Sequence, residues 1–464
     1  MNKSFTLHYS VLLKFFKPLF YIFIIPALLK FLWGRSNLLA LIQLLGGLTV
    51  IAVAFLYRKN FKLLITEKEI YIKTGAIFLK STKIPIERVT VIKLRRRITD
   101  RIFGSTLVTL NTEAGRKGKS DFSFLLSKKD AVAFEQAVFG QETSNDKHTF
   151  SFVRVAIMAA TTSAALTGAL ICIPLIKNLT RLFGTGLDLY LFSQIEKVAP
   201  FKDYLPPAAN AVTIALAVSF LIGFAVIFLR YIRFCFWGKE LLKAESGIIT
   251  RTRTVFPLKK LSCIITEQNQ LMRLLKLCSI RAEIGGIRQQ KGDSAVVSPA
   301  VTLKKREQIA AEHFPEFLPF TVSARPLRGS LYRFFVKTII VAALFTAGLF
   351  ILSYIFPDFT QFLYLLAAAG LLAAVYSMHL SVINYKKGGV GVRGKKLIAV
   401  NTVFGKLTEM VCDKELIGLI KIRRSPADIY LKSCTVTLSL RNESGIGLKV
   451  RFISYEKLKE LIRE

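Results

Sequence analysis

The hydrophobic pattern of the chain alternates long apolar runs with shorter runs in which β-branched and aromatic residues recur near every second position. A helix of about 20 apolar residues is long enough to cross the hydrocarbon core of a bilayer. The apolar runs occur in pairs, so we expect six transmembrane helices arranged as three hairpins. The expected spans are 18–33 and 38–57, 155–176 and 208–229, and 338–356 and 362–383.

A β-rich block follows each pair of apolar runs. Strands are expected at 61–66, 69–73 and 105–111 in the first block and at 435–440 in the last. Each block ends in an amphipathic segment, and in the first block Ser127 and Asp130 have the spacing of a helix N-terminal cap. Several short strands followed by one helix predict a bent sheet or partial barrel closed by a C-terminal helix.

The blocks are copies of one unit. Adding 172 to the positions of three landmark residues of the first block recovers the same residue types in the second. The landmarks are Gly75, Pro85 and Arg101, which become Gly247, Pro257 and Arg273. A third, looser copy lacks the Gly and the Pro. The predicted domains are hairpins at 1–57, 151–229 and 331–383, and β domains at 58–140, 230–320 and 384–464.

Charge is distributed unevenly along this apolar chain. Hydrophobic residues make up 52% of the 464 positions, yet 66 Lys/Arg face 30 Asp/Glu, which gives a net charge of +36. The loop side of the three expected hairpins holds six basic residues, counting Lys30 near the end of the first span. The remaining 66 − 6 = 60 lie on the side of the β blocks or just inside the membrane entry points. The six are Lys30, Arg35, Lys177, Arg181, Lys197 and Lys202. Because basic loops stay in the cytoplasm, we expect cytoplasmic β domains and termini.

The first block carries a family motif. Gly75, the segment Ile84-Pro85-Ile86-Glu87-Arg88-Val89 and the segment Arg101-Ile102-Phe103-Gly104 resemble the bacterial pleckstrin-homology-like (PH-like) membrane proteins of the YdbS/YdbT type, in a multi-copy form. The resemblance implies a strongly bent seven-stranded sheet in each cytoplasmic β domain, a place in the bacterial plasma membrane, and a smaller single-unit relative as a partner. We interpret the motif residues as structural: Gly75, Pro85, Arg88, Arg101, Gly104, Gly247, Pro257 and Arg273.

The sequence lacks the signals of an enzyme. Gly389, Gly391 and Gly394 satisfy G-x-G-x-x-G, but an apolar helix precedes them and a strand-like run follows, which reverses the context of a dinucleotide site. No nucleophile elbow, paired carboxylates or histidine-centred triad occurs. The six cysteines and four histidines are scattered without metal-ligand spacing. We therefore expect no catalysis, no cofactor and no metal.

The basic clusters of the β blocks are the candidate binding residues. One interpretation is topological, because positive residues keep loops inside. The other is attraction to anionic lipid headgroups, worth about 1 kcal/mol for each basic residue near the surface. Nucleic acid is not expected, because no recognition motif accompanies the charge. The candidates for lipid or partner binding are Lys93, Arg95, Arg96, Arg97, Arg101, Lys304, Lys305, Arg306, Lys395, Lys396, Arg423 and Arg424.

The sequence therefore predicts a binding or scaffolding protein at the inner leaflet, with anionic lipid or a protein as its partner and cell-envelope maintenance as one process it would serve. The alternative is a transporter or channel component. That alternative requires ionisable residues within the membrane helices, and the expected spans contain only Lys30 and His379.

Overall fold

The structure of the 464-residue chain is a computed structural model. The residues it describes are 3–15, 37–113, 121–140, 147–161, 207–284, 295–327, 329–357, 360–403, 405–440 and 447–463. They form two compact units, which are described separately. The first comprises Met1–His148, Cys235–Leu261 and Ile284–Asp293, and the second comprises Thr149–Phe234, Ser262–Glu283 and Ser294–Glu464. The short strand β8 (His148–Thr149) spans one boundary between them.

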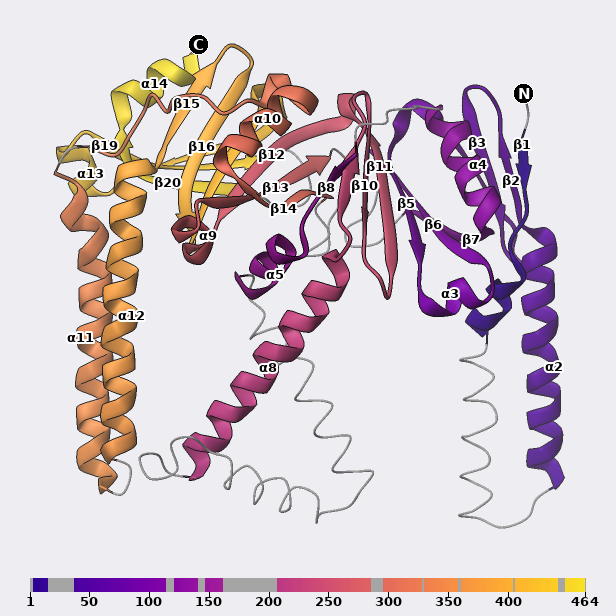
Figure 1. The fold of residues 1–464 in the computed structure, drawn as a ribbon, viewed down its shortest axis with the longest axis horizontal. Coiled ribbons are helices and arrows are strands. Elements are labelled where there is room, and N and C mark those ends of the chain that lie inside the picture. The colour runs from indigo at the N-terminus through magenta and orange to yellow at the C-terminus, as the bar shows by residue number, and fades with distance from the viewer. Residues whose placement is uncertain are drawn as a thin grey trace. The chain divides into compact units, whose positions relative to one another are not determined.

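The first unit contains the 3-10 helix η1 (Tyr9–Phe15) and the long helix α2 (Asn37–Asn60, Figure 1). Its first sheet has the order β1-β2-β3-β4. The strands of this sheet are β1 (Lys3–Phe5), β2 (Lys62–Ile65), β3 (Glu69–Thr74) and β4 (Lys80–Pro85). Burial alternates along β2, where Leu63 and Ile65 are buried and Leu64 is exposed. This alternation places one face of the sheet on the core.

A 3-10 turn, η2 (Ile86–Arg88), leads from β4 into the second half of the first repeat. That half consists of β5 (Val89–Arg96), α3 (Ile98–Ile102), β6 (Ser105–Thr112), β7 (Phe122–Ser127) and α4 (Lys128–Phe139). Ser127 caps α4 by accepting a hydrogen bond from the backbone N–H of Asp130, as its sequence spacing predicts. Phe134 of α4 is fully buried against Phe5 and Phe124, so this helix closes the core.

The second half of the first repeat continues into the first half of the second repeat. β5 pairs antiparallel with β11, and the strands lie side by side in the order β7-β6-β5-β11-β10-β9 (Figure 1). The added strands are β9 (Cys235–Trp237), β10 (Leu241–Ser246) and β11 (Arg251–Pro257). One continuous sheet therefore contains strands from two copies of the sequence repeat.

The second unit repeats this arrangement with the order β14-β13-β12-β17-β16-β15. After η3 (Leu258–Lys260), its elements in chain order are β12 (Leu261–Gln268), α9 (Gln270–Leu274), β13 (Leu277–Ile284), β14 (Ala295–Thr302), α10 (Leu303–His313), η4 (Pro315–Phe317), β15 (Gly389–Arg393), β16 (Lys396–Val403) and β17 (Lys406–Asp413). A last three-stranded sheet follows η6 (Lys414–Leu416). It contains β18 (Ile417–Arg423), β19 (Ser433–Leu440) and β20 (Gly447–Ser454), with α13 (Pro426–Tyr430) and the terminal α14 (Tyr455–Arg463).

Both pairings between repeats have the same register. Ile92 lies opposite Val255, and Ile264 lies opposite Val411. Ile264 of β12 comes 172 positions after Ile92 of β5, and the first residues of these two strands are also 172 positions apart (261 − 89). Likewise, Val411 of β17 comes 156 positions after Val255 of β11, and the last residues of these two strands are also 156 positions apart (413 − 257). The pairing is therefore a property of the repeat and not of one pair of strands.

PH-like β domains are seen, but the prediction of six transmembrane helices as three hairpins is wrong. Among the described residues, two helices are long and apolar enough to cross a membrane: α11 (Leu331–Ile355) and Leu366–Lys387 of α12 (Thr360–Lys387). They lie side by side (Figure 1), and a Cβ on Gly370 would come within 2.6 Å of the ring of Phe345. The expected span 18–33 lies outside the described residues, as does 162–176 of another.

The reason for this error is visible in α5 (Phe152–Thr161), which begins the expected span 155–176. Its residues Met158 and Ala159 are buried in a cluster with Ile227 of α8 (Pro207–Tyr231) and with Met272, Leu277 and Ala300. Hydropathy counts apolar residues but does not distinguish a helix packed against protein from one that faces lipid. This apolar run starts as part of a protein core.

Candidate membrane-facing site

Three short helices occupy equivalent places in the repeats. α3 connects β5 to β6, α9 connects β12 to β13, and α13 connects β18 to β19. Each of these helices has five residues. A helix this short cannot bury all of its apolar side chains. Ile102 is 73% exposed, Leu274 is 79% exposed and Tyr430 is 88% exposed. We call the exposed apolar residues of these segments the apolar tips: Ile98, Ile102 and Phe103; Leu271, Leu274 and Leu275; and Ile429, Tyr430 and Leu431.

Basic residues flank each apolar tip. The first has Arg97 and Arg101, the second Arg273 and Lys276, and the third Arg424 and Lys432. An exposed apolar group surrounded by cations matches a membrane–water interface, because apolar side chains enter the acyl boundary while the cations meet anionic headgroups. The tips therefore have the chemistry of a lipid-binding surface.

A hydrogen bond holds the first tip against the next repeat. The Arg101 guanidinium donates to the carbonyl oxygen of Ile248, which lies in the hairpin between β10 and β11. The neighbouring Ile249 is exposed in that hairpin. One surface of the first unit thus joins the tip of one repeat to the hairpin of the following repeat.

The third tip is tied to the first apolar helix of the α11–α12 pair. Arg333, in the first turn of α11, lies 2.8 Å from the Asp428 carboxylate and donates to the Ser433 hydroxyl at 3.1 Å. Its guanidinium also lies over the ring of Phe452, 4.3 Å from the centroid. These contacts fix α13 beside the N-terminus of α11. Tyr430 of α13 therefore lies near the N-terminal end of α11, a helix that is apolar enough to cross a membrane.

The environment of Asp428 keeps this link charged. Burial alone would raise its pKa, but hydrogen bonds from the Ser425 backbone and hydroxyl, from Ser433 and from Arg333 outweigh burial and lower the pKa to about 2. Asp428 also caps α13 through reciprocal hydrogen bonds with Ser425. The carboxylate therefore both starts the short helix and holds it on α11.

A further exposed apolar turn lies between β3 and β4, where Ile77 and Phe78 are exposed. Asn60, at the end of α2, donates to the Ala76 carbonyl oxygen at 2.9 Å and positions this hairpin. The turn requires glycine at position 75, because φ is +132° and a Cβ would lie 1.9 Å from the carbonyl oxygen of Phe78.

The basic residues predicted from the sequence have different positions. Lys93, Arg95 and Arg96 lie on β5 opposite residues of β11, and Arg97 directly precedes α3, where its backbone N–H donates to the Asp100 carboxylate. The structure therefore gathers this cluster, together with Arg101, around the junction of two repeats and the first tip.

In the second unit, several predicted basic residues form internal contacts instead. Arg306 lies 3.3 Å from Glu409, and Lys396 lies 2.7 Å from Asp413. The ion pairs place both groups in the protein framework. The remaining predicted residues of this unit lie at the start of α10 (Lys304 and Lys305), in the β15–β16 turn (Lys395) and at the end of β18 (Arg423 and Arg424). Of these, Arg423 and Arg424 directly precede α13 and its tip.

The motif residues occupy turns and short helices. Gly75, Gly104 and Gly247 have positive φ values, Pro85 and Pro257 end β4 and β11 before a 3-10 turn, Arg88 ends η2, and Arg273 lies in α9. These positions belong to the framework that presents the tips.

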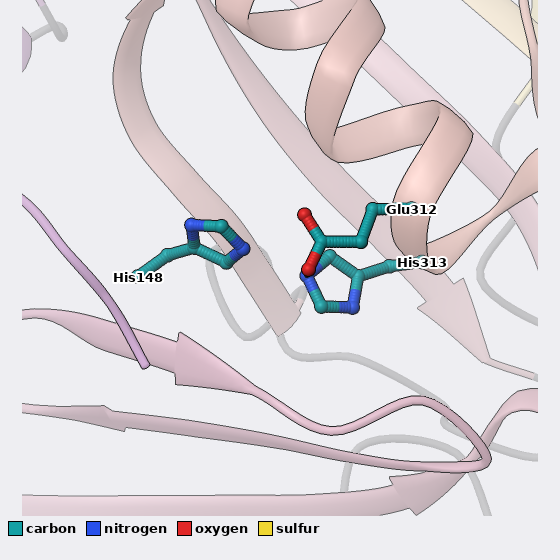
Figure 2. A group of neighbouring side chains, drawn as sticks. All are labelled: His148, Glu312 and His313. Carbon is teal, nitrogen blue, oxygen red and sulfur yellow. The ribbon is translucent and has the colours of Figure 1, made fainter. Parts of the chain in front are cut away.

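Two candidate metal ligands lie at the end of α10. His313 Nε2 is 3.9 Å from Glu312 Oε1 (Figure 2). His148, which Figure 2 also labels, belongs to the other unit, so the three side chains do not define a site within one unit.

Comparison with protein families identifies the repeat. The bacterial PH domain model matches residues 19–141 and 190–313. The chain belongs to the bacterial PH domain family. The starts of the two matches differ by 171 in position (190 − 19), close to the 172 that separates the landmark residues, which confirms the internal repeat. PH domains indicate a binding or scaffolding role. No curated protein and no solved structure matches the chain.

The apolar tips were missed by reasoning from sequence. The segment Arg101-Ile102-Phe103-Gly104 was interpreted as a structural motif. A signal was present, because two large apolar residues adjoin arginines just before a glycine, where a turn is expected. The equivalent segment of the second repeat, Arg273-Leu274-Leu275-Lys276, also has two large apolar residues after an arginine, but Lys276, with φ +54°, stands where the first repeat has glycine.

Proposed function

We propose that the chain is a membrane-anchored binding module that places three PH-like domains on an anionic membrane surface. The proposal is supported above all by the apolar tips, which recur at equivalent positions with basic neighbours, and by the Arg333–Asp428 link that ties one tip to α11. The module acts by binding and not by catalysis.

The α11–α12 pair supplies the anchor in this proposal. Arg333 and Lys337 lie near the start of α11, and Lys386 and Lys387 end α12, while the connection at 356–359 has no Lys or Arg. Positive residues favour the cytoplasmic side, so both ends of the pair, the β domains and the chain termini are assigned to the cytoplasm of a bacterial cell.

The energetics favour lipid contact through several weak sites. Burying a large apolar side chain contributes about 1.5–3 kcal/mol, so a tip with three half-exposed residues contributes on the order of 3 kcal/mol. Each nearby basic residue adds about 1 kcal/mol on an anionic leaflet. Three tips on one anchored chain act together, because the anchor keeps their local concentration high.

Within the family, we assign the chain to the multi-copy YdbS/YdbT type. The assignment rests on the apolar segments that precede the β domains and on the repeated motif. In this proposal a protein partner, such as a smaller single-unit PH-like membrane protein, uses surfaces that the lipid does not cover, and the complex serves cell-envelope maintenance.

Fluorescence quenching by lipids tests the proposal. The full chain carrying Ile102→Cys is labelled with bimane and reconstituted into bilayers that contain brominated acyl chains and anionic lipid. We expect quenching at this tip, and no quenching at the matched control Lys129→Cys on the exposed side of α4. Equal fluorescence of the Ile102 label in brominated and ordinary lipid would refute lipid insertion by the tip.

A further inference from the structure

Two of the described strands, β18 and β4, lie at open sheet edges although they correspond to the strands whose pairing joins the repeats. The first residue of β18 corresponds to the first residue of β12 (417 − 261 = 156), and the last residue of β4 corresponds to the last residue of β11 (257 − 85 = 172). Among the described strands, β18 pairs with β19, and β4 pairs with β3. In the two internal junctions, by contrast, β5 pairs with β11 and β12 pairs with β17.

The exposure of apolar side chains on β18 indicates that this strand lacks a neighbouring strand on one side. Leu419 is 57% exposed, whereas its counterparts Val91 and Cys263 are both 0% exposed. Ile422 is 40% exposed, and its counterpart Leu94 is 6% exposed. An edge strand with exposed apolar residues and unpaired backbone groups is a template for another strand. The side chains of β18 are therefore those of a strand in the middle of a sheet.

We propose that β18 of one chain pairs antiparallel with β4 of a second copy of this chain, which extends the repeat from chain to chain. The register follows from the two internal pairings. Ile420 corresponds to Ile264 (420 − 264 = 156) and Lys83 corresponds to Val255 (255 − 83 = 172), so Ile420 lies opposite Lys83. By the same offsets, Lys421 lies opposite Thr82 and Ile422 lies opposite Ser81.

A second copy is favoured as the occupant because one chain carries both complementary edges. The interface is heterologous: it uses the β18 edge of one copy and the β4 edge of the next. Such contacts form rings when the rotation closes and open chains when it does not. Backbone hydrogen bonds supply the affinity, as in other cases where a strand is added to a sheet edge.

Charge makes this association distinguishable from lipid binding. Both edges are basic, with Lys80 and Lys83 on β4 and with Lys421 and Arg423 on β18. Arg96 already lies opposite Arg251 at the first junction, so the fold tolerates such pairs. Salt screens like charges. Association between copies therefore strengthens as salt rises, whereas attraction to anionic lipid weakens.

Cross-linking of the full chain tests the proposal. Two differently tagged variants, Thr82→Cys and Lys421→Cys, are mixed in detergent and treated with a short thiol cross-linker. Side chains directly opposite in antiparallel strands have Cβ atoms roughly 5 Å apart, which is within reach. We expect a dimer that carries both tags, and little cross-linking in either variant alone, because neither position lies opposite itself.

The controls fix the register and the native cysteines. Ser81→Cys mixed with Lys421→Cys moves one thiol to the other face of the sheet and is expected to cross-link far less. Wild type measures the background from the native cysteines. Leu419→Lys, at an exposed position, is expected to reduce cross-linking at least tenfold without unfolding the chain.

Three results would overturn the proposal: no dimer in the mixture, equal dimer formation by either variant alone, or a mixed cross-link that weakens as salt rises. In whole membranes, cross-linking of either thiol to another polypeptide, with no mixed dimer of the chain, would assign the edges to a different partner and would also overturn it.

Discussion

Removing the carboxylate of Glu135 tests the continuity of the sheet between repeats. Glu135 lies on α4 of the first repeat and is 2% exposed. One of its carboxylate oxygens lies 3.5 Å from Lys243 on β10 and 3.4 Å from Arg253 on β11, both in the second repeat. The substitution Glu135→Gln leaves two cations together at a buried site, with Lys243 only 7% exposed.

The expected effect is large and local. Removing one partner from a buried ion pair costs about 3–5 kcal/mol. A cost of about 3 kcal/mol raises the population of locally open states by roughly two orders of magnitude. Hydrogen–deuterium exchange of the full chain measures this directly, and we expect faster exchange in peptides from α4, β10 and β11.

The second junction supplies the matched control. Arg306 of α10 lies 3.3 Å from Glu409 of β17, but their side chains are 12% and 22% exposed. Water screens this pair more, so Arg306→Gln is expected to cost about 1 kcal/mol or less. Glu135→Leu combined with Lys243→Met removes the more deeply buried of the two stranded cations, because the Arg253 side chain is 27% exposed, and is expected to restore much of the protection. Unchanged exchange in Glu135→Gln, or an equal increase along the whole chain, would refute the reasoning.

The remaining predictions concern single sites. Because the pKa of Asp428 is about 2 instead of 3.8, its ionised form contributes about 2 kcal/mol above pH 4, and this contribution is lost as the pH falls from about 4 to 2. Asp428→Asn should therefore lower the melting temperature at pH 7 but much less at pH 2.5; an equal loss at both values would contradict the ion-pair account. Gly75→Ala should destabilise the chain by more than about 2 kcal/mol, because its Cβ meets the Phe78 carbonyl oxygen, while Gly104→Ala has nothing within 4 Å and should cost about 1 kcal/mol. Similar melting temperatures for the two would contradict this. Burial raises the pKa of the Cys412 thiol to about 12, so it should resist maleimide at pH 7.5 until the protein is unfolded; fast labelling of the native state would show that the sheet opens.

Much of the local structure could be predicted from the sequence. The strands expected at 61–66 and 69–73 are β2 and β3, and the helix expected after Ser127 is α4. These elements are specified by short-range signals, namely period-two apolar residues and a capping side chain. The internal repeat was also predictable, because its glycine and proline hold fixed places in turns.

The pairing of repeats could not be predicted in this way. An apolar strand such as β12 has the same pattern whether its neighbour is in the same repeat or the next, so hydrophobic periodicity does not identify the partner. The burial of Met158 was hidden for a related reason, because hydropathy does not distinguish a protein core from lipid. The exposure of Ile102 depends on a five-residue helix that cannot cover it, which only the three-dimensional structure shows.

Hydrogen–deuterium exchange on lipid bilayers tests the central claim most directly, because it reports all three apolar tips at once. The full chain is placed in nanodiscs of neutral lipid and in nanodiscs that contain anionic lipid. We predict slower exchange in the segments of α3, α9 and α13 on the anionic bilayer, reversed by high salt, with α4 unchanged. Identical exchange of the three segments on both bilayers would contradict the account.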